Sequence, residues 1–164
     1  MKKYAVIVAG GSGLRMGTVV PKQFLELDGK PVLWYTLTAF LKAFNDLEII
    51  LVVPEAHVEK GLEIIRSTFE PDRIGITVGG ETRFHSVKKG LDHIQQHSIV
   101  FVHDGVRCLI TPELIRTCYD TAIEKGNAIP AVTAVDTIRL ETINGNQQVD
   151  RNKVRIIQTP QTFY

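Results

Sequence analysis

Several features that mark common classes of protein are missing from this sequence. Its 164 residues include only two cysteines, Cys108 and Cys118, and neither lies in a Cys-x-x-Cys or Cys/His pattern. A disulfide framework and a cysteine-based metal site are therefore excluded, and a reducing compartment is expected. Nineteen basic against eighteen acidic residues give a formal net charge of +1. So small an excess predicts no coating of nucleic acid and no electrostatic binding to a membrane.

Long hydrophobic runs, internal repeats and low-complexity segments are also absent. The apolar run at residues 4–9 is too short for the core of a signal peptide and far too short to cross a bilayer. Since no Pro-, Gly- or Ser-rich linker divides the chain, we expect a single domain over residues 1–164. The composition, with 44% hydrophobic residues, is that of a globular protein. We therefore expect a soluble, cytoplasmic protein.

Short apolar runs alternate with amphipathic segments along most of the chain. The apolar runs cover residues 4–9, 48–53, 75–78, 99–103 and 127–132. Apolar residues repeat at helical spacing over residues 33–44 and again from Leu114 to Ile123, and both stripes are expected to pack on a sheet. Thr111 and Pro112 make a good cap and first turn for the second helix. This alternation predicts an α/β fold with a mostly parallel sheet flanked by helices.

The last quarter of the chain departs from this alternation. Residues 136–151 contain two strand-like stretches around Asn144-Gly145, a typical turn of a β-hairpin. The stretches are rich in polar residues, and an isolated two-stranded hairpin is only marginally stable in water. We therefore expect a protruding β-hairpin arm that is supported either by its own domain or by another subunit.

A glycine-rich segment follows the first apolar run. Residues 9–17 read Ala-Gly-Gly-Ser-Gly-Leu-Arg-Met-Gly, and Pro21-Lys22-Gln23 come soon after. Glycines let backbone N–H groups approach a phosphate closely, but neither the dinucleotide-binding pattern nor the P-loop pattern is matched. Arg15 and Lys22 could grip a polyphosphate from two sides. The alternative is a plain connection between a strand and a loop.

Two further polar clusters follow later apolar runs. Gly-Gly-Glu-Thr-Arg occupies residues 79–83, and His-Asp-Gly-Val-Arg occupies residues 103–107. Because ligands bind at the carboxyl edge of an open parallel sheet, both clusters are expected near one site. Asp104 could hold a divalent cation or a hydroxyl group, and Arg107 could hold a phosphate. The alternative is an ordinary Asp–Arg pair at the start of a helix.

Together these motifs resemble those of a known family. The string at residues 9–16, with Pro21-Lys22-Gln23, is similar to the signature of nucleotidyltransferases that activate sugar phosphates. The resemblance is narrowed to the 2-C-methyl-D-erythritol 4-phosphate cytidylyltransferases by residues 79–83, 86–87, 103–107, 136–137, 149–151 and 159–161. It implies a Rossmann-like fold and a homodimeric transferase of the non-mevalonate isoprenoid pathway. That enzyme would use CTP and Mg²⁺ and would release pyrophosphate.

The resemblance also implies roles for individual residues. The catalytic residues would be Arg15, Lys22, Asp104 and Arg151, with Arg15 and Lys22 on the CTP phosphates and Asp104 as a candidate Mg²⁺ ligand. Cytosine and ribose would be enclosed by Ala9, Gly10, Gly11, Gly13, Gly80, Glu81, Ser86 and Gly105. Methylerythritol phosphate would be surrounded by Asp104, Arg107, Thr137, Arg151 and Thr159. Thr137 and Arg151 would come from the hairpin arm of a partner subunit.

The implied chemistry is in-line attack by the substrate phosphate on the α-phosphorus of CTP, which depends on positioning and charge neutralisation. Two residues depart from the family pattern: Glu81 stands where Asp is common, and Cys108 where Pro is usual. Family chains continue past residues 159–161 through a helix, a strand and a phosphate-contacting lysine, so a C-terminally truncated domain is expected. Two alternatives stay open: a ribitol 5-phosphate cytidylyltransferase, and a dimeric nucleotide-binding module without turnover.

Overall fold

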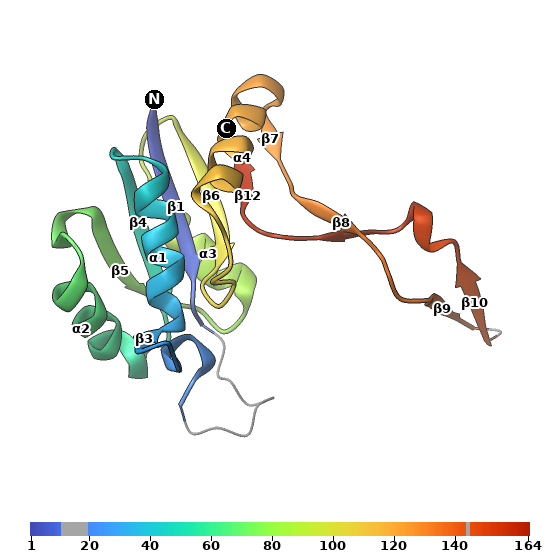
Figure 1. Cartoon of the computed structure of the whole chain (residues 1–164), viewed down its shortest axis with the longest axis horizontal. Coiled ribbons are helices and arrows are strands. Elements are labelled where there is room, and N and C mark those ends of the chain that lie inside the picture. The colour runs from blue at the N-terminus through green and yellow to red at the C-terminus, as the bar shows by residue number, and fades with distance from the viewer. Residues whose placement is uncertain (11–19, 144) are drawn as a thin grey trace.

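The computed structural model describes residues 1–10, 20–143 and 145–164 and shows an α/β body from which a thin arm projects (Figure 1). A six-stranded sheet in the order β5-β4-β1-β6-β12-β7 forms the centre of the body. Its parallel strands are β1 (Lys2–Val8), β4 (Leu47–Val53), β5 (Ile74–Val78) and β6 (Ser98–Asp104). Its antiparallel strands are β12 (Gln161–Phe163) and β7 (Asn127–Ala128). The predicted α/β fold with a mostly parallel sheet is confirmed.

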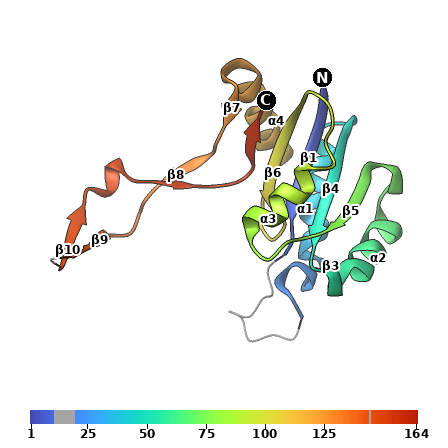
Figure 2. The same ribbon diagram turned by 180° about the vertical axis from the view of Figure 1, so that it is seen from behind.

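Helices cover the two faces of the sheet unequally, as Figures 1 and 2 show from opposite sides. The longer helices are α1 (Val32–Ala43), α2 (Val58–Thr68), α3 (Arg83–Leu91) and α4 (Pro112–Lys125). Side chains of α1, α2 and α4 share one buried cluster with Ala5 and Ile7 of β1. Val6, between them, faces α3 on the other side of the sheet, together with Ile50 and Val52 of β4. The central strands β1 and β4 are thus buried on both faces, which explains their continuous apolar runs.

The two predicted apolar stripes belong to α1 and α4. The Thr111 hydroxyl accepts a hydrogen bond from the Leu114 N–H at 3.3 Å, and Pro112 begins α4, so the predicted cap is confirmed. The buried stripes consist of Leu33, Leu37 and Phe40 in α1 and of Ile115, Cys118 and Ala122 in α4. The prediction is wrong for Leu114 and Ile123, which are 41% and 47% exposed. At 100° per residue they lie on the two flanks of the α4 stripe, turned toward solvent.

The predicted single strand over residues 127–132 is also wrong. The chain forms β7 and then leaves the central sheet, and β8 (Ala131–Thr133) pairs instead with β11 (Arg155–Ile157). Pro130 lies between the two strands and has no N–H to continue a ladder, while its carbonyl accepts a hydrogen bond from the Gln158 N–H at 2.8 Å. The run therefore divides at the proline.

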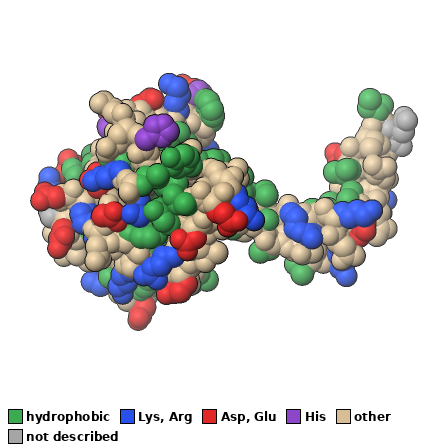
Figure 3. Space-filling view, turned by 90° about the horizontal axis from the view of Figure 1, so that it is seen from above, with side chains coloured by type: hydrophobic (Ala, Val, Ile, Leu, Met, Phe, Trp, Pro, Cys, Tyr) green, Lys and Arg blue, Asp and Glu red, His purple; other side chains and the backbone are tan. Residues whose placement is uncertain are grey.

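The hairpin arm is present as predicted. β9 (Ile138–Thr142) pairs antiparallel with β10 (Gly145–Val149), and Gly145 begins β10 with a φ of 121°. Asn144 lies outside the described residues. The arm stands clear of the body and carries both basic and hydrophobic side chains (Figure 3). Leu140 is 52% exposed and Ile143 is fully exposed, so the body of the same chain does not support the hairpin.

The remaining elements are short. They are the strands β2 (Glu26–Leu27) and β3 (Lys30–Pro31) and the 3₁₀ helices η2 (Lys22–Phe24), η3 (Glu55–His57), η4 (Pro71–Arg73) and η5 (Arg151–Lys153). β2 and β3 join through Asp28 and Gly29, both with positive φ, as a tight hairpin turn requires. No helix in the described ranges is long and apolar enough to cross a membrane.

Candidate active site

The carboxyl ends of β1, β5 and β6 meet at one edge of the sheet. Backbone hydrogen bonds extend the sheet past the strand ends: the Ala9 N–H donates to Val52, the Gly79 N–H to Val53 and the Gly105 N–H to Val8, each at 2.8 Å. The segments that begin at Ala9, Gly79 and Asp104 therefore leave the sheet side by side. This is the edge at which ligands bind in open parallel sheets.

Ser86 of α3 fixes the turn that follows β5. Its hydroxyl is buried, accepts a hydrogen bond from the Gly80 N–H at 3.1 Å and lies 3.3 Å from the Gly80 carbonyl. A Cβ atom on Gly80 would come within 2.4 Å of the His85 Cβ, and one on Gly10 would lie 3.7 Å from the Ser86 hydroxyl. Only glycine fits at residue 80, because the turn presses directly against the first turn of α3.

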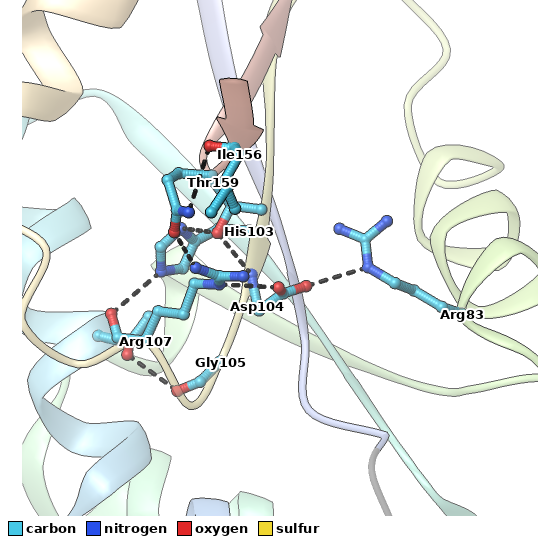
Figure 4. Close-up of polar contacts among 9 residues, drawn as sticks. Arg83, His103, Asp104, Gly105, Arg107, Ile156 and Thr159 are labelled. Atoms are coloured by element: carbon cyan, nitrogen blue, oxygen red, sulfur yellow. Dashed lines mark hydrogen bonds and ion pairs between the residues drawn. The ribbon is translucent and has the colours of Figure 1, made fainter. Parts of the chain in front are cut away.

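Asp104 lies between two arginines (Figure 4). Its Oδ1 accepts from Arg83 Nε and its Oδ2 from Arg107 Nε, both at 3.0 Å. Burial alone would raise the pKa of the Asp104 carboxyl, but hydrogen bonds from Arg107 and Arg83 outweigh it and lower that pKa. The group is a fixed anion that orients two guanidiniums. One carboxylate between two guanidiniums leaves an excess of positive charge, as a phosphate site requires.

Arg83 received no role from the sequence, although it ends the Gly-Gly-Glu-Thr-Arg motif. It is the first residue of α3, and the Thr82 hydroxyl caps that helix by accepting from the His85 N–H at 3.3 Å. In Figure 4 the two terminal nitrogens of Arg83 point away from Asp104. The signal that could have identified it was its place directly after a glycine turn at the ligand edge, across from Asp104.

Gln23 is a second residue whose importance the sequence did not reveal. Its side chain is buried, and Nε2 donates to the Ala9 carbonyl at 2.6 Å. This bond ties η2 to the end of β1 and places Lys22, which is half-buried, near the same edge. In the Pro-Lys-Gln motif, Gln23 thus fixes the position of η2, and Lys22 beside it supplies the positive charge.

His103 is completely buried at the end of β6. Its Nδ1 lies 3.0 Å from the Thr159 hydroxyl and its Nε2 lies 3.3 Å from the Arg107 carbonyl. The ring of Phe40 packs edge-on against it, with centroids 5.2 Å apart. Burial lowers the pKa of His103 from 6.5 to about 4, so the ring is neutral at physiological pH.

We expect the protein to lose stability as the pH falls from 6.5 to about 4. In this window the unfolded chain protonates His103 at its ordinary pKa of 6.5, whereas the folded chain does not until about pH 4. The unfolded state therefore binds more protons, and the loss amounts to about 3 kcal/mol. Urea denaturation between pH 7 and pH 4 measures it. His103→Asn should remove this dependence and His93→Asn, at an exposed site, should keep it. An unchanged slope in His103→Asn would contradict the assignment.

The remaining sequence-predicted site residues divide into three groups. The structure brings Ala9, Gly10, Gly80, Glu81, Ser86, Asp104, Gly105, Arg107 and Thr159 to the loops and strand ends of this edge, with Lys22 close by. Thr137 and Arg151 lie on the arm, away from the edge, where Arg151 Nη1 donates to the Val135 carbonyl at 2.9 Å (Figure 1). Gly11, Gly13 and Arg15 lie outside the described residues.

Comparison with known proteins gives a consistent result. Residues 4–164 match the family model described as 2-C-methyl-D-erythritol 4-phosphate cytidylyltransferase. Proteins of that name from Bacteroides thetaiotaomicron and Phocaeicola vulgatus are 46% and 44% identical to the chain over 163 residues, which cover 99% of the chain and 74% of each relative. A crystal structure of 4-diphosphocytidyl-2C-methyl-D-erythritol synthase from Anaerococcus prevotii is similar with a TM-score of 0.83 at 30% identity, covering 99% of this chain and 69% of that one.

Proposed function

The chain belongs to the family of 2-C-methyl-D-erythritol 4-phosphate cytidylyltransferases, and from this premise we propose how its residues carry out the reaction. The enzyme transfers a cytidylyl group from CTP to 2-C-methyl-D-erythritol 4-phosphate and releases pyrophosphate, a step of isoprenoid biosynthesis. The observation that carries the proposal is the convergence of three loop segments with the Arg83–Asp104–Arg107 cluster at one edge of the sheet.

On the nucleotide side, we propose that the turns after β1 and β5 enclose the cytidine. Ala9, Gly10, Gly80 and Ser86 would surround the base, and Glu81 and Gly105 would face the ribose. The absence of a side chain at Gly80, where a Cβ atom would meet His85, supports this role, because a flat base can pack closely against a backbone from which no side chain projects. Lys22, with Arg15, would neutralise the triphosphate.

On the acceptor side, we propose that Arg107 and Arg83 bind the phosphate of methylerythritol phosphate, with Thr159 beside them. Asp104 holds both arginines by their Nε atoms, and Arg107 Nη1 donates to the Gln158 side chain. The terminal nitrogens of Arg83, which point away from Asp104, and Nη2 of Arg107 can then bind a ligand. A phosphate monoester is already anionic near pH 7, so it attacks the α-phosphorus without a general base. The protein contributes alignment of the two phosphates and compensation of their charge.

The described residues do not fit a metal site of the protein's own. Both oxygens of Asp104 are engaged by guanidiniums, whose charge would repel a divalent cation. In the described part of the chain, no cluster of three or more His, Cys, Asp or Glu could hold a metal. We propose that Mg²⁺ enters with CTP, held by phosphate oxygens.

We further propose that the enzyme is a homodimer whose active sites are shared through the arms over residues 136–151. The arm reaches away from its own body, and its tip is exposed in the isolated chain (Figures 1 and 3). A bare two-stranded hairpin is too unstable to place Thr137 and Arg151 against a substrate. Docking on a two-fold related subunit would support both arms equally.

Pyrophosphate release tests the proposed function directly. With methylerythritol phosphate as acceptor, we expect turnover with CTP and a kcat/KM at least about 10²-fold lower with UTP, because groups that bind the exocyclic amine of cytosine would be left unpaired. Ribitol 5-phosphate in place of methylerythritol phosphate serves as the matched acceptor control. Faster reaction with ribitol 5-phosphate would transfer the assignment to that substrate, equal use of UTP would contradict the cytidine site, and CTP binding without turnover would indicate a binding module.

A further inference from the structure

A buried chain of hydrogen bonds runs beneath the phosphate-binding edge (Figure 4). The Asp104 N–H lies 3.4 Å from the Thr159 hydroxyl, which lies 3.0 Å from His103 Nδ1, and His103 Nε2 lies 3.3 Å from the Arg107 carbonyl. Thr159 lies 55 residues from Asp104 and 56 from His103 in sequence, and the pairing of β12 with β6 brings it to them. These hydrogen bonds join three residues of the proposed acceptor site, Asp104, Thr159 and Arg107. The link between them is His103, which has no proposed role in that site.

The partners fix the direction of every bond in this chain. A carbonyl oxygen only accepts, so the proton of the neutral ring must sit on Nε2 and point to Arg107. Nδ1 is then an acceptor, and the Thr159 hydroxyl must donate to it. The Thr159 oxygen in turn accepts from the Asp104 N–H. The hydroxyl hydrogen of Thr159 therefore points into the protein. Toward a ligand, the Thr159 oxygen offers only a lone pair.

The imidazole cannot easily rearrange to reverse this order. Phe40 packs edge-on against the ring, and the neighbouring turn is held from α1, where the Thr36 hydroxyl donates to the Gly105 carbonyl at 2.9 Å. Both His103 and Thr36 are fully buried. Packing of this kind restricts a side chain to one rotamer.

We propose that His103 is a positioning residue for the transfer reaction: its neutral Nε2–H form holds Thr159 as a hydrogen-bond acceptor and fixes the Asp104–Arg107 turn relative to it. A group of the acceptor substrate that meets Thr159 must then be a donor, such as a hydroxyl of the polyol chain, and not a phosphate oxygen. The inference rests on the proposed function, because it concerns the acceptor side of that site.

Kinetics of paired variants test the positioning role. His103→Gln can still donate to the Arg107 carbonyl but offers Thr159 no acceptor at the Nδ1 position, whereas His103→Asn has the opposite pattern. We expect His103→Gln to raise KM for methylerythritol phosphate about five- to tenfold, the effect of one neutral hydrogen bond, and to leave KM for CTP unchanged. In a Thr159→Val background the same change should add nothing, because the hydroxyl that His103 orients is already absent.

Effects of His103→Gln and Thr159→Val that multiply, or a parallel rise of both KM values, would overturn the proposal in favour of a purely structural histidine. NMR of ¹⁵N-histidine-labelled wild-type protein at pH 7 tests the tautomer without any variant and without substrate. A neutral ring protonated on Nε2 is expected, and an Nδ1-protonated or charged ring would overturn the proposal. Failure of the proposed function would appear separately, as absence of pyrophosphate release by the wild type.

Discussion

Arg107→Ala is expected to lower kcat by about 10²–10³-fold, the loss typical of one well-placed donor to a charged transition state. Arg107 is held by Asp104 through Nε at 3.0 Å and also donates from Nη1 to the Gln158 side chain, so its guanidinium is oriented before the substrate arrives. The attack brings two phosphate groups together, and removing this cation leaves their repulsion less compensated. Steady-state pyrophosphate release measures the effect.

Two further variants separate the contribution of charge from that of geometry. Arg107→Lys keeps the charge but cannot span from the carboxylate to a ligand with a planar fork, so an intermediate loss is expected. Arg66→Ala, on the exposed face of α2, removes an arginine far from the edge and should leave kcat unchanged. All three proteins should melt normally, because exposed ion pairs contribute little to stability. Near-normal turnover of Arg107→Ala, or its unfolding, would contradict the proposed role.

The parallel part of the fold was predictable because its central strands β1, β4 and β6 are buried on both faces and are therefore apolar runs. All four parallel strands, including the more exposed edge strand β5, end within a residue or two of the predicted bounds. The antiparallel strands carry no such signal. β12 spans only three residues, Gln-Thr-Phe, and depends on the edge of β6. β7 spans only two and depends in turn on β12. Their pairing is a tertiary effect without a local pattern.

The candidate site was predictable to the extent that it follows from the rule for parallel sheets. From the sequence alone, that rule predicts that the segments at Ala9, Gly80 and Asp104 meet at one edge of the sheet. The rule could not identify Gln23 or His103, because the role of a buried polar side chain depends on its hydrogen-bond partner. That partner is Ala9, 14 residues away, for Gln23, and Thr159, 56 residues away, for His103. In sequence such residues look like any glutamine or histidine next to a motif.

A shared active site predicts that two inactive variants restore each other. Arg151 lies on the arm, tied to the Val135 carbonyl, and Arg107 lies on the body, so in a dimer with exchanged arms one site needs Arg107 of one subunit and Arg151 of the other. Arg107→Ala and Arg151→Ala should each be nearly inactive alone. After complete subunit exchange, half of the dimers are mixed and each has one intact site, so about a quarter of wild-type activity should return.

A mixture of Arg107→Ala with Lys22→Ala is the matched control, because both residues belong to the body of one subunit and every site in the mixed dimer then lacks one cation. That mixture should stay inactive. Recovery of activity in the control would mean that Arg107 and Lys22 act in sites of different subunits. If the mixture of Arg107→Ala with Arg151→Ala stays inactive after verified subunit exchange, Arg151 acts in the site of its own subunit. Light scattering at micromolar concentration gives an independent test of the dimer. The exposed hairpin needs a second subunit to hold Arg151 in place, so a monomeric mass would contradict the shared site.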